Sequence, residues 1–460
     1  MKHYIFFLLL FFCTEAFSQE SFIIEYNISD EFSLMKSSKG KLYVSDSKSL
    51  FVNQTKIYDT NTLKLNEAGT EIIGDTIDKE YEVLKDFDTK YIYSESIIKY
   101  QRGITQKDFL NIFNWEYLNQ EKKILGYQCK AAKTKYRGRE YIAFYTDEIK
   151  IKDGPWKFNG LDGLILEVFE INGRISFNAT NVNLLNEKIP IKPNLDTENS
   201  LYLSSIISKA KRKYFEKKRA VEKKFNGIAT TDFSNYIEIY DLNNQENYLI
   251  NYDVFAEIKY EKEEYKTLTS NFELISNYNE SNYKYIDKIQ NIQGVSEYGY
   301  ISEVGVLYKN LVNQTFEQNK VLYDQKFIIA DTIPNIDWEI LPSFTEQILN
   351  FNTIKAVANY EGNYIEAWFA PDILIENGPG QYGGLPGLIL KLTLQRTDSA
   401  NTNTKEITYY VAKKANQIEP KSIVKPKGGK IVSAQEYDEI YEEIMKKIRE
   451  MYGQGVEVSD

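Results

Sequence analysis

The side chains that could carry out acid–base or nucleophilic chemistry in this chain are mainly carboxylates. The 460 residues include a single histidine, His3, which lies in an N-terminal segment that we expect to be removed. Its loss excludes Ser-His-Asp and Cys-His catalysis, a histidine general base and every imidazole metal site. An enzyme built on this chain would therefore depend on a pair of Asp and Glu residues, or on Lys or Tyr.

A glycine-rich string occurs twice and could in principle cradle a phosphate. GPWKFNGLDGLIL at residues 154–166 returns as GPGQYGGLPGLIL at residues 378–390, at a constant shift (378 − 154 = 224). A phosphate loop opens a helix and usually carries Lys followed by Ser or Thr. Here an apolar strand-like run follows each copy, and no such pair is present. We interpret the string as a fixed turn that leads into a buried strand, with Gly and Pro setting the backbone.

Three carboxylates precede the first copy and are the candidates for acid–base work. They are Asp147, Glu148 and Asp153, and the constant shift pairs them with Pro371, Asp372 and Asn377. Only the pair of Glu148 and Asp372 keeps a carboxylate in both halves, so we expect solvated loop acids. No Asp-x-Asp-x-Asp-Gly calcium loop is present. The sequence therefore offers no catalytic residue, no metal site and no cofactor.

Cys129 is the one cysteine that remains once Cys13 leaves with the N-terminal segment. A lone cysteine cannot form an intramolecular disulfide, even in a compartment that permits one. We expect Cys129 to be a small buried apolar residue, although a reactive thiol or an intermolecular disulfide is the alternative. The paired position holds Thr353.

The N-terminus resembles a secretory signal. Lys2 and His3 precede an apolar stretch, and Ala16-Phe17-Ser18 has the small-x-small form of a signal peptidase site, so we expect cleavage after Ser18. The stretch is too short for a membrane anchor, and no other segment is apolar enough to cross a membrane. We predict an exported protein, periplasmic or secreted, with no transmembrane segment in the mature chain.

Composition favours a sheet-dominated fold. Aromatic residues make up 14% of the chain, and the net charge of −10 argues against nucleic acid as a partner. Alternation of apolar and polar side chains is typical of half-buried antiparallel strands. The clearest predicted strands are residues 22–28, 141–145, 174–179 and 406–411.

The repeat extends far beyond the glycine-rich string and predicts two tandem domains. Gly138, Ala143 and Phe144 align without a gap to Gly362, Ala367 and Trp368, and Trp115 matches Trp338 after one insertion. Each unit of roughly 200 residues can bury its own core, whereas solenoid repeats are far shorter. We predict a signal peptide at 1–18, a first domain at 19–225, a linker at 226–247 and a second domain at 248–460.

Each unit is expected to close with a helix. Ser433-Ala434-Gln435-Glu436 is a capping box, and an apolar stripe at helical spacing follows until Gly453. In the first unit, residues from about 197 to 225 show a similar stripe. The basic run from Lys209 to Lys224 is interpreted as a solvated helix face. The predicted fold class is α+β, mainly β: two tandem curved antiparallel sheets, half-barrel-like, each closed by a C-terminal helix.

The ordered landmarks of both units resemble the GLPGLI family of secreted Bacteroidetes proteins. The second unit contains the name string intact, whereas the first has Asp162 in place of the proline and the second lacks the Gly-Tyr-x-Cys element. The resemblance implies two tandem copies and a structural role for the matching residues. These are Trp115, Cys129, Gly154, Pro155, Gly160, Leu161, Gly163, Leu164, Ile165, Trp338, Gly378, Pro379, Gly384, Leu385, Pro386, Gly387, Leu388 and Ile389.

The same resemblance implies an envelope-associated protein of unestablished activity, with no catalytic residues to carry over. The layout is also similar to periplasmic half-barrel carriers of lipophilic ligands, although a shared fold does not fix function. We favour a non-enzymatic protein that binds an envelope protein, a peptide or a lipophilic ligand, with the groove between the units as a candidate site. The alternative is a carboxylate-based hydrolase. Because Trp156 and Phe158 are replaced by Gly380 and Tyr382, any ligand of this loop should differ between the units.

Overall fold

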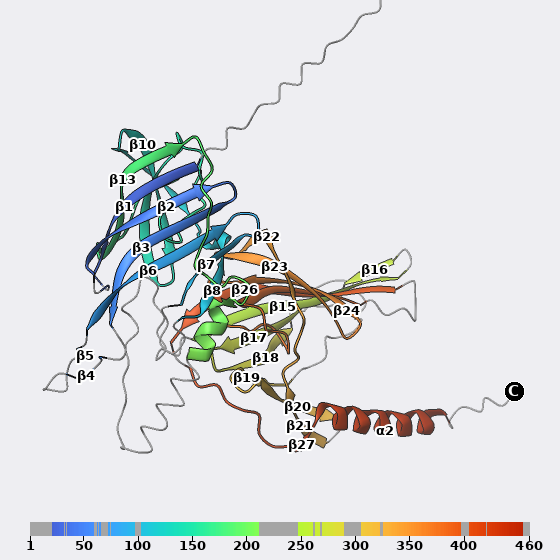
Figure 1. Cartoon of the computed structure of the whole chain (residues 1–460). Coiled ribbons are helices and arrows are strands. Elements are labelled where there is room, and N and C mark those ends of the chain that lie inside the picture. The colour runs from blue at the N-terminus through green and yellow to red at the C-terminus, as the bar shows by residue number, and fades with distance from the viewer. Residues whose placement is uncertain are drawn as a thin grey trace, which may run out of the picture.

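The computed structural model (Figure 1) describes most of the chain. The described residues are 21–31, 33, 35–58, 62, 64–65, 72–73, 75–96, 103–210, 247–260, 263–266, 269–288, 305–322, 325–396, 404–419 and 421–453. The predicted signal peptide and nearly all of the predicted linker lie outside these residues, as does the basic run beyond residue 210. The domain boundaries remain predictions.

The first lobe is an open sheet of 12 strands in the order β14-β8-β7-β6-β3-β2-β1-β13-β12-β11-β10-β9. A short 3₁₀ turn, η1 (Leu110–Ile112), follows β8, and β4 (Lys64–Leu65) pairs with β5 (Ile72–Ile73) outside the sheet. The strands are β1 (Ser21–Asp30), β2 (Ser37–Ser45), β3 (Lys48–Tyr58), β6 (Thr76–Asp86), β7 (Tyr91–Glu95), β8 (Thr105–Phe109), β9 (Glu116–Ile124), β10 (Tyr127–Tyr136), β11 (Arg139–Thr146), β12 (Leu164–Glu170), β13 (Ile175–Leu185) and β14 (Leu201–Tyr202).

The second lobe is a sheet in the order β22-β23-β24-β25-β26-β15-β17-β18-β19-β20-β21-β27, with β16 paired to β15. Its strands are β15 (Asn247–Tyr260), β16 (Glu263–Lys266), β17 (Ser270–Ser276), β18 (Glu280–Lys288), β19 (Leu307–Asn310), β20 (Thr315–Leu322), β21 (Gln325–Thr332), β22 (Glu339–Ile348), β23 (Phe351–Tyr360), β24 (Asn363–Ala370), β25 (Leu388–Arg396), β26 (Thr404–Ile418) and β27 (Lys430–Val432).

The two sheets have the same topology strand for strand. Read from β9 and from β22, the two orders match at all positions along the path, and in both sheets a short final strand pairs in parallel, β14 with β8 and β27 with β21. The remaining pairings in both sheets are antiparallel. The predicted fold class, two tandem antiparallel sheets in a mainly β chain, is confirmed. Three of the predicted strands lie in β1, β11 and β26, and the fourth, 174–179, lies in β13 except for its first residue.

A helix follows the last strand of each sheet. The capping box of α2 (Ala434–Gly453) is confirmed, because the Ser433 amide donates to Glu436 Oε2 (2.8 Å) and the Glu436 amide donates to Ser433 Oγ (3.1 Å). In the first lobe the described helical residues are 203–210. That helix begins later than predicted because Leu201 and Tyr202 pair with β8 as strand β14.

The hydrophobic cores of the lobes meet. One cluster of buried side chains covers the interior of lobe 1 and continues into β23–β25 of lobe 2. Phe109 of β8 packs edge-on against Phe369 of β24, with ring centroids 5.7 Å apart. A second cluster lies within lobe 2 and includes Tyr437 of α2. In Figure 1 the lobes lie side by side with β7, β8, β22 and β23 at their boundary.

Candidate functional site

The two glycine-rich strings fold into matching loops, each at the entrance to a core strand. The Ile165 amide donates to Asp153 O (2.9 Å) and the Ile389 amide to Asn377 O (2.9 Å). The Phe158 and Tyr382 amides each donate to the carbonyl of the loop proline at 3.1 Å. The apolar run that follows each loop forms β12 in lobe 1 and β25 in lobe 2. The Tyr26 hydroxyl donates to Ile165 O, and the Tyr252 hydroxyl donates to Ile389 O. The loops are therefore turns that place a buried strand.

A buried lysine that the sequence did not predict donates hydrogen bonds to the backbone of the first loop. Lys85 of β6 is fully buried, and its Nζ donates to Gly154 O (2.6 Å) and Phe158 O (3.3 Å). The same ammonium forms a buried ion pair with Asp153. Burial lowers the pKa of Lys85, and the Asp153 carboxylate opposes that shift. We expected Asp153 to be solvated, and that prediction was wrong, because Asp153 is the counter-ion of a core lysine.

The second lobe keeps the lysine and lacks the counter-ion. Lys309 of β19 lies at the same shift (309 − 85 = 224), and its Nζ donates to Gly378 O (3.1 Å) and Tyr382 O (3.2 Å). Asn377 replaces the carboxylate and donates to Ser276 Oγ (2.9 Å). Burial lowers the pKa of Lys309 to about 7. Lys85 and Lys309 are separated by the same 224 residues as the two glycine-rich strings. That shared spacing was the sequence signal that could have revealed both lysines.

The motif glycines allow the loop to approach the preceding strand. A Cβ on Gly163 would lie 2.0 Å from Thr146 O, and one on Gly387 would lie 2.3 Å from Ala370 O. Because no heavy atom can approach a carbonyl oxygen so closely, only glycine fits at these two positions without moving backbone. This contact is the same in both lobes.

The other predicted motif residues also surround the loops. The indole of Trp115 donates to Asn159 O (2.9 Å), and that of Trp338 donates to Gly383 O (3.0 Å). Gly160 and Gly384 adopt positive φ values of 90° and 83° at the exposed end of each loop. The remaining motif residues are buried: Cys129, Gly154, Pro155, Leu161, Leu164, Ile165, Gly378, Pro379, Leu385, Pro386, Leu388 and Ile389. Burial raises the pKa of the Cys129 thiol to about 11, which disfavours the thiolate.

The other candidate acids do not form a catalytic pair. Asp147 forms an ion pair with Lys130 (2.7 Å), and exposed Glu148 accepts from the Gln128 amide (2.7 Å). Asp372 lies at the lobe boundary, where burial raises the pKa of its carboxyl to about 6, against the opposing effect of Arg137. In the described part of the chain, no cluster of three or more His, Cys, Asp or Glu side chains could hold a metal ion.

Polar contacts join the lobes next to the first loop. Asn352 Nδ2 donates to Phe113 O (3.3 Å), and Asn111 Nδ2 donates to Pro342 O (3.4 Å). Asn352 belongs to the segment that replaces the Gly-Tyr-x-Cys element of lobe 1. Elsewhere on the boundary, Ser204 and Ser205 of the first-lobe helix both donate to Glu376 (2.8 and 2.7 Å). The second copy has therefore diverged where it contacts the first.

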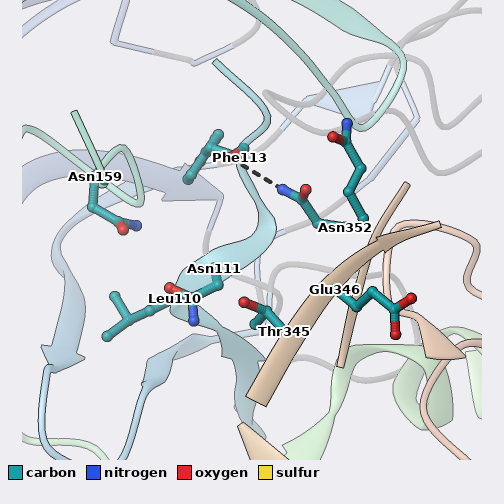
Figure 2. Close-up of a pocket in the computed structure, with 9 residues that line it drawn as sticks. Leu110, Asn111, Phe113, Asn159, Thr345, Glu346 and Asn352 are labelled. Carbon is teal, nitrogen blue, oxygen red and sulfur yellow. Dashed lines mark hydrogen bonds between the residues drawn. The ribbon is translucent and has the colours of Figure 1, made fainter. Parts of the chain in front are cut away.

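A pocket of about 350 Å³ opens between the lobes beside these contacts. Figure 2 shows first-lobe residues facing second-lobe residues across it. The one carboxylate on its wall, Glu346, is an ion-pair partner of Lys391 (3.1 Å). Side-chain amides and a hydroxyl supply most of the other polar groups. The lining residues are Leu110, Asn111, Phe113, Asn159 and Gly160 from lobe 1, and Thr345, Glu346, Gln347 and Asn352 from lobe 2.

Two family matches cover separate parts of the chain. Residues 33–206 match the family described as N-glycanase peptide, N-terminal domain, and residues 352–391 match a family described as a protein of unknown function (Porph_ging). The second match contains the intact string of lobe 2. Together the matches indicate a Bacteroidetes envelope-type protein. A search of curated proteins found no match.

Solved structures resemble the chain only distantly. PNGF-II in its C2 crystal form is 13% identical with a TM-score of 0.28, over 85% of this chain and 67% of that one. Intact Ap-TbpB, with N and C lobes, is 8% identical with a TM-score of 0.17, over 87% of this chain and 77% of that one. TM-scores of this size carry no inference about function. Among the described helices, none is long and apolar enough to span a membrane.

Proposed function

We propose that the chain is an exported, non-enzymatic envelope protein that binds a neutral glycan or glycopeptide in the interlobe pocket. The observation that carries the proposal is the set of amide side chains that both lobes contribute to one pocket. Asparagine and glutamine amides donate and accept hydrogen bonds without charge, which suits hydroxyl-rich ligands. The match of residues 33–206 to an N-terminal domain of an N-glycanase supports the same ligand class.

The proposal includes the predicted organisation of the chain. We infer two GLPGLI-like domains, 19–225 and 248–460, joined by a linker at 226–247 and preceded by a signal peptide at 1–18 that directs export to the periplasm or beyond. The duplicated sheet order and the paired loops support this division. The match of residues 352–391 to a family of unknown function is compatible with it.

The hydrolase alternative has less support. Its best pair of carboxylates is Asp372 and Asp108, which interact across the lobe boundary. Asp108 accepts from Arg137 (2.9 Å) and Tyr136 (3.4 Å), and neither acid lines the interlobe pocket. A carboxylate held by an arginine and set back from the pocket is poorly placed to reach a glycosidic or amide bond.

Isothermal titration of the mature chain with an N-linked glycopeptide and with its deglycosylated form tests the proposal. We expect binding of the glycosylated form alone, weakened by Asn111→Ala and by Gln347→Ala. Asn178→Ala, an exposed amide on β13 away from the pocket, is the matched control. Equal binding of both peptides would contradict a glycan ligand. Detection of released free glycan by mass spectrometry would favour the hydrolase instead.

A further inference from the structure

The interior of lobe 1 beside its loop is filled by the chain's own aromatic rings. Trp156 is only 4% exposed although its φ is +52°, a left-handed conformation that is unfavourable for a bulky residue. Its indole packs against Tyr136 at 5.9 Å and Phe158 at 5.3 Å between ring centroids. Phe158 in turn contacts Phe177, which contacts Phe51, at 6.1 Å each. Lobe 1 therefore accepts local strain to place an indole here.

Lobe 2 keeps the tyrosine, with Tyr360 in place of Tyr136, and changes the other four positions. The constant shift pairs Trp156 with Gly380 and Phe158 with Tyr382. Strand register supplies the other two pairs: Phe51 lies opposite Leu42 as Tyr283 lies opposite Leu274, and Phe177 lies opposite Val168 as Tyr410 lies opposite Leu392. The indole is thus deleted, and three phenylalanines become tyrosines.

The deletion leaves room over Gly380. The backbone there keeps the left-handed conformation, with φ of +54°. Among the described residues other than its two chain neighbours, a Cβ built on Gly380 would meet only the Tyr382 ring within 4 Å, at 3.9 Å. Tyr360, the counterpart of Tyr136, is half-buried, as are Gly380, Tyr382 and Tyr410. Their lobe 1 counterparts are all buried. The same backbone therefore carries less buried side chains in lobe 2, and no side chain takes the place of the indole.

An unpaired hydroxyl lies in the wall of this aromatic group. Tyr283 is 2% exposed, and its Oη has no hydrogen-bond partner among the described residues. It interacts electrostatically with Tyr410, whose ring contacts that of Tyr382 at 6.2 Å. A buried hydroxyl without a partner is destabilising, and the phenylalanine of lobe 1 would avoid that penalty. The hydroxyl of Tyr283 therefore has no structural role in the hydrogen bonding of the described residues.

We propose that lobe 2 binds an aromatic ring bearing a hydrogen-bonding group in the space over Gly380, where lobe 1 holds the indole of Trp156. The tyrosine rings supply apolar faces and edges for stacking, and the Tyr283 hydroxyl supplies a directional contact. Lobe 1 is the permanently filled form of the site. This site is separate from the interlobe pocket, since none of its residues lines that pocket.

Titration of the mature chain with indole and p-cresol tests the proposal, with toluene and glucose as comparison probes. We expect one equivalent of indole or p-cresol to bind per chain, toluene to bind more weakly, and glucose not to bind. Gly380→Trp should abolish binding, because the new indole takes the position of the ligand on a backbone that already tolerates tryptophan in lobe 1. Gly380→Ala introduces the same backbone strain without the ring and should retain binding.

A second variant tests the hydrogen bond of the Tyr283 hydroxyl independently of the position over Gly380. Tyr283→Phe restores the lobe 1 residue, so it should fold, and it should weaken p-cresol binding by roughly three- to tenfold while leaving toluene unchanged. Three results would overturn the proposal: no binding of indole or p-cresol, unchanged binding in a folded Gly380→Trp variant, or preferential binding of glucose. Binding of the glycopeptide by Gly380→Trp should be unaffected, so failure here and failure of the interlobe proposal are distinguishable.

Discussion

The two loops share one backbone and differ in how they treat a buried amine. Lys85 and Lys309 donate to equivalent loop carbonyls, yet only Lys85 has a carboxylate partner. In lobe 2 the neutral Asn377 occupies the position of Asp153 and donates to Ser276, whereas lobe 1 has Val44 at the register position of Ser276. The difference teaches that the loop requires the lysine as a hydrogen-bond donor, whereas the charge balance around it is free to vary.

The largest expected contrast comes from removing each lysine. Lys85→Met leaves the Asp153 carboxylate buried without a cation, which should lower the free energy of unfolding by about 3–5 kcal/mol. Lys309→Met leaves only two carbonyls without a donor, and we expect a loss of about 1–3 kcal/mol. Urea unfolding measures both losses, and hydrogen exchange of loop peptides assigns each loss to its lobe.

A double variant checks the cause. Lys85→Met combined with Asp153→Asn removes the uncompensated charge and should recover a large part of the stability lost by Lys85→Met alone. Equal losses for the two single lysine variants would show that charge pairing contributes nothing to the difference between the loops.

The glycines should respond alike in both lobes. Gly163→Ala and Gly387→Ala each push a Cβ into a backbone carbonyl, so each should cost about 1–3 kcal/mol or more through overpacking. Urea midpoints of the two variants give the comparison, with Asp162→Ala as the exposed neighbouring control. A large loss in only one lobe would show that the loops are not equivalent supports.

Lys309 should make the stability of lobe 2 depend on pH. The pKa of Lys309 is about 7 in the folded chain and about 10.4 when unfolded, so between these values the unfolded state binds the extra proton. The free energy of unfolding should therefore rise with pH above about 7, by at most about 1.4 kcal/mol per unit. Asn377→Asp supplies a carboxylate and should flatten the rise. Hydrogen exchange of lobe 2 peptides from pH 6.5 to 9 measures the slope, and an unchanged slope in Asn377→Asp would refute the assignment.

The smallest change in stability should come from Asp162, which stands where the second string has Pro386. Asp162→Pro converts the first string to the form of the second. Asp162 is exposed and pairs with an equally exposed Lys152 (2.7 Å), so screening leaves little to lose. We expect no measurable change in the urea midpoint, and a clear destabilisation would mean that the proline and the aspartate need different backbones.

The sequence predicted the repeated architecture because that information is local and periodic. The Gly-Pro turns, the alternating strands and the capping box at Ser433 each depend on a few neighbouring residues, and all were confirmed. The lysines were missed because each meets its loop across 69 residues of chain. Asp153 reads as a polar loop residue until that contact is known. Nothing local distinguishes it from Asp147, which does lie at the surface.

The candidate site was predictable only in outline. The exchange of Trp156 for Gly380 predicted that any ligand of this loop would differ between the two lobes. The absence of a side chain at Gly380 is the basis of the proposed site in lobe 2, which remains untested. Two tyrosines of the proposed site, Tyr283 and Tyr410, come from β18 and β26, and their pairing with the phenylalanines of lobe 1 requires strand register. The interlobe pocket could not be derived from one unit, because its wall is formed by both.

The pairing of the first strand of each sheet also determines the order in which a lobe can assemble. Ser21 of β1 lies opposite Leu185 of β13, and Asn247 of β15 lies opposite Ile418 of β26. Contacts between such distant segments form slowly, since a long loop must close first. Until the late strand arrives, β1 or β15 keeps an edge of unpaired amides and carbonyls on which another chain can add a strand. A truncation before β13 or β26 thus leaves the centre of the sheet open, and aggregation is the expected result.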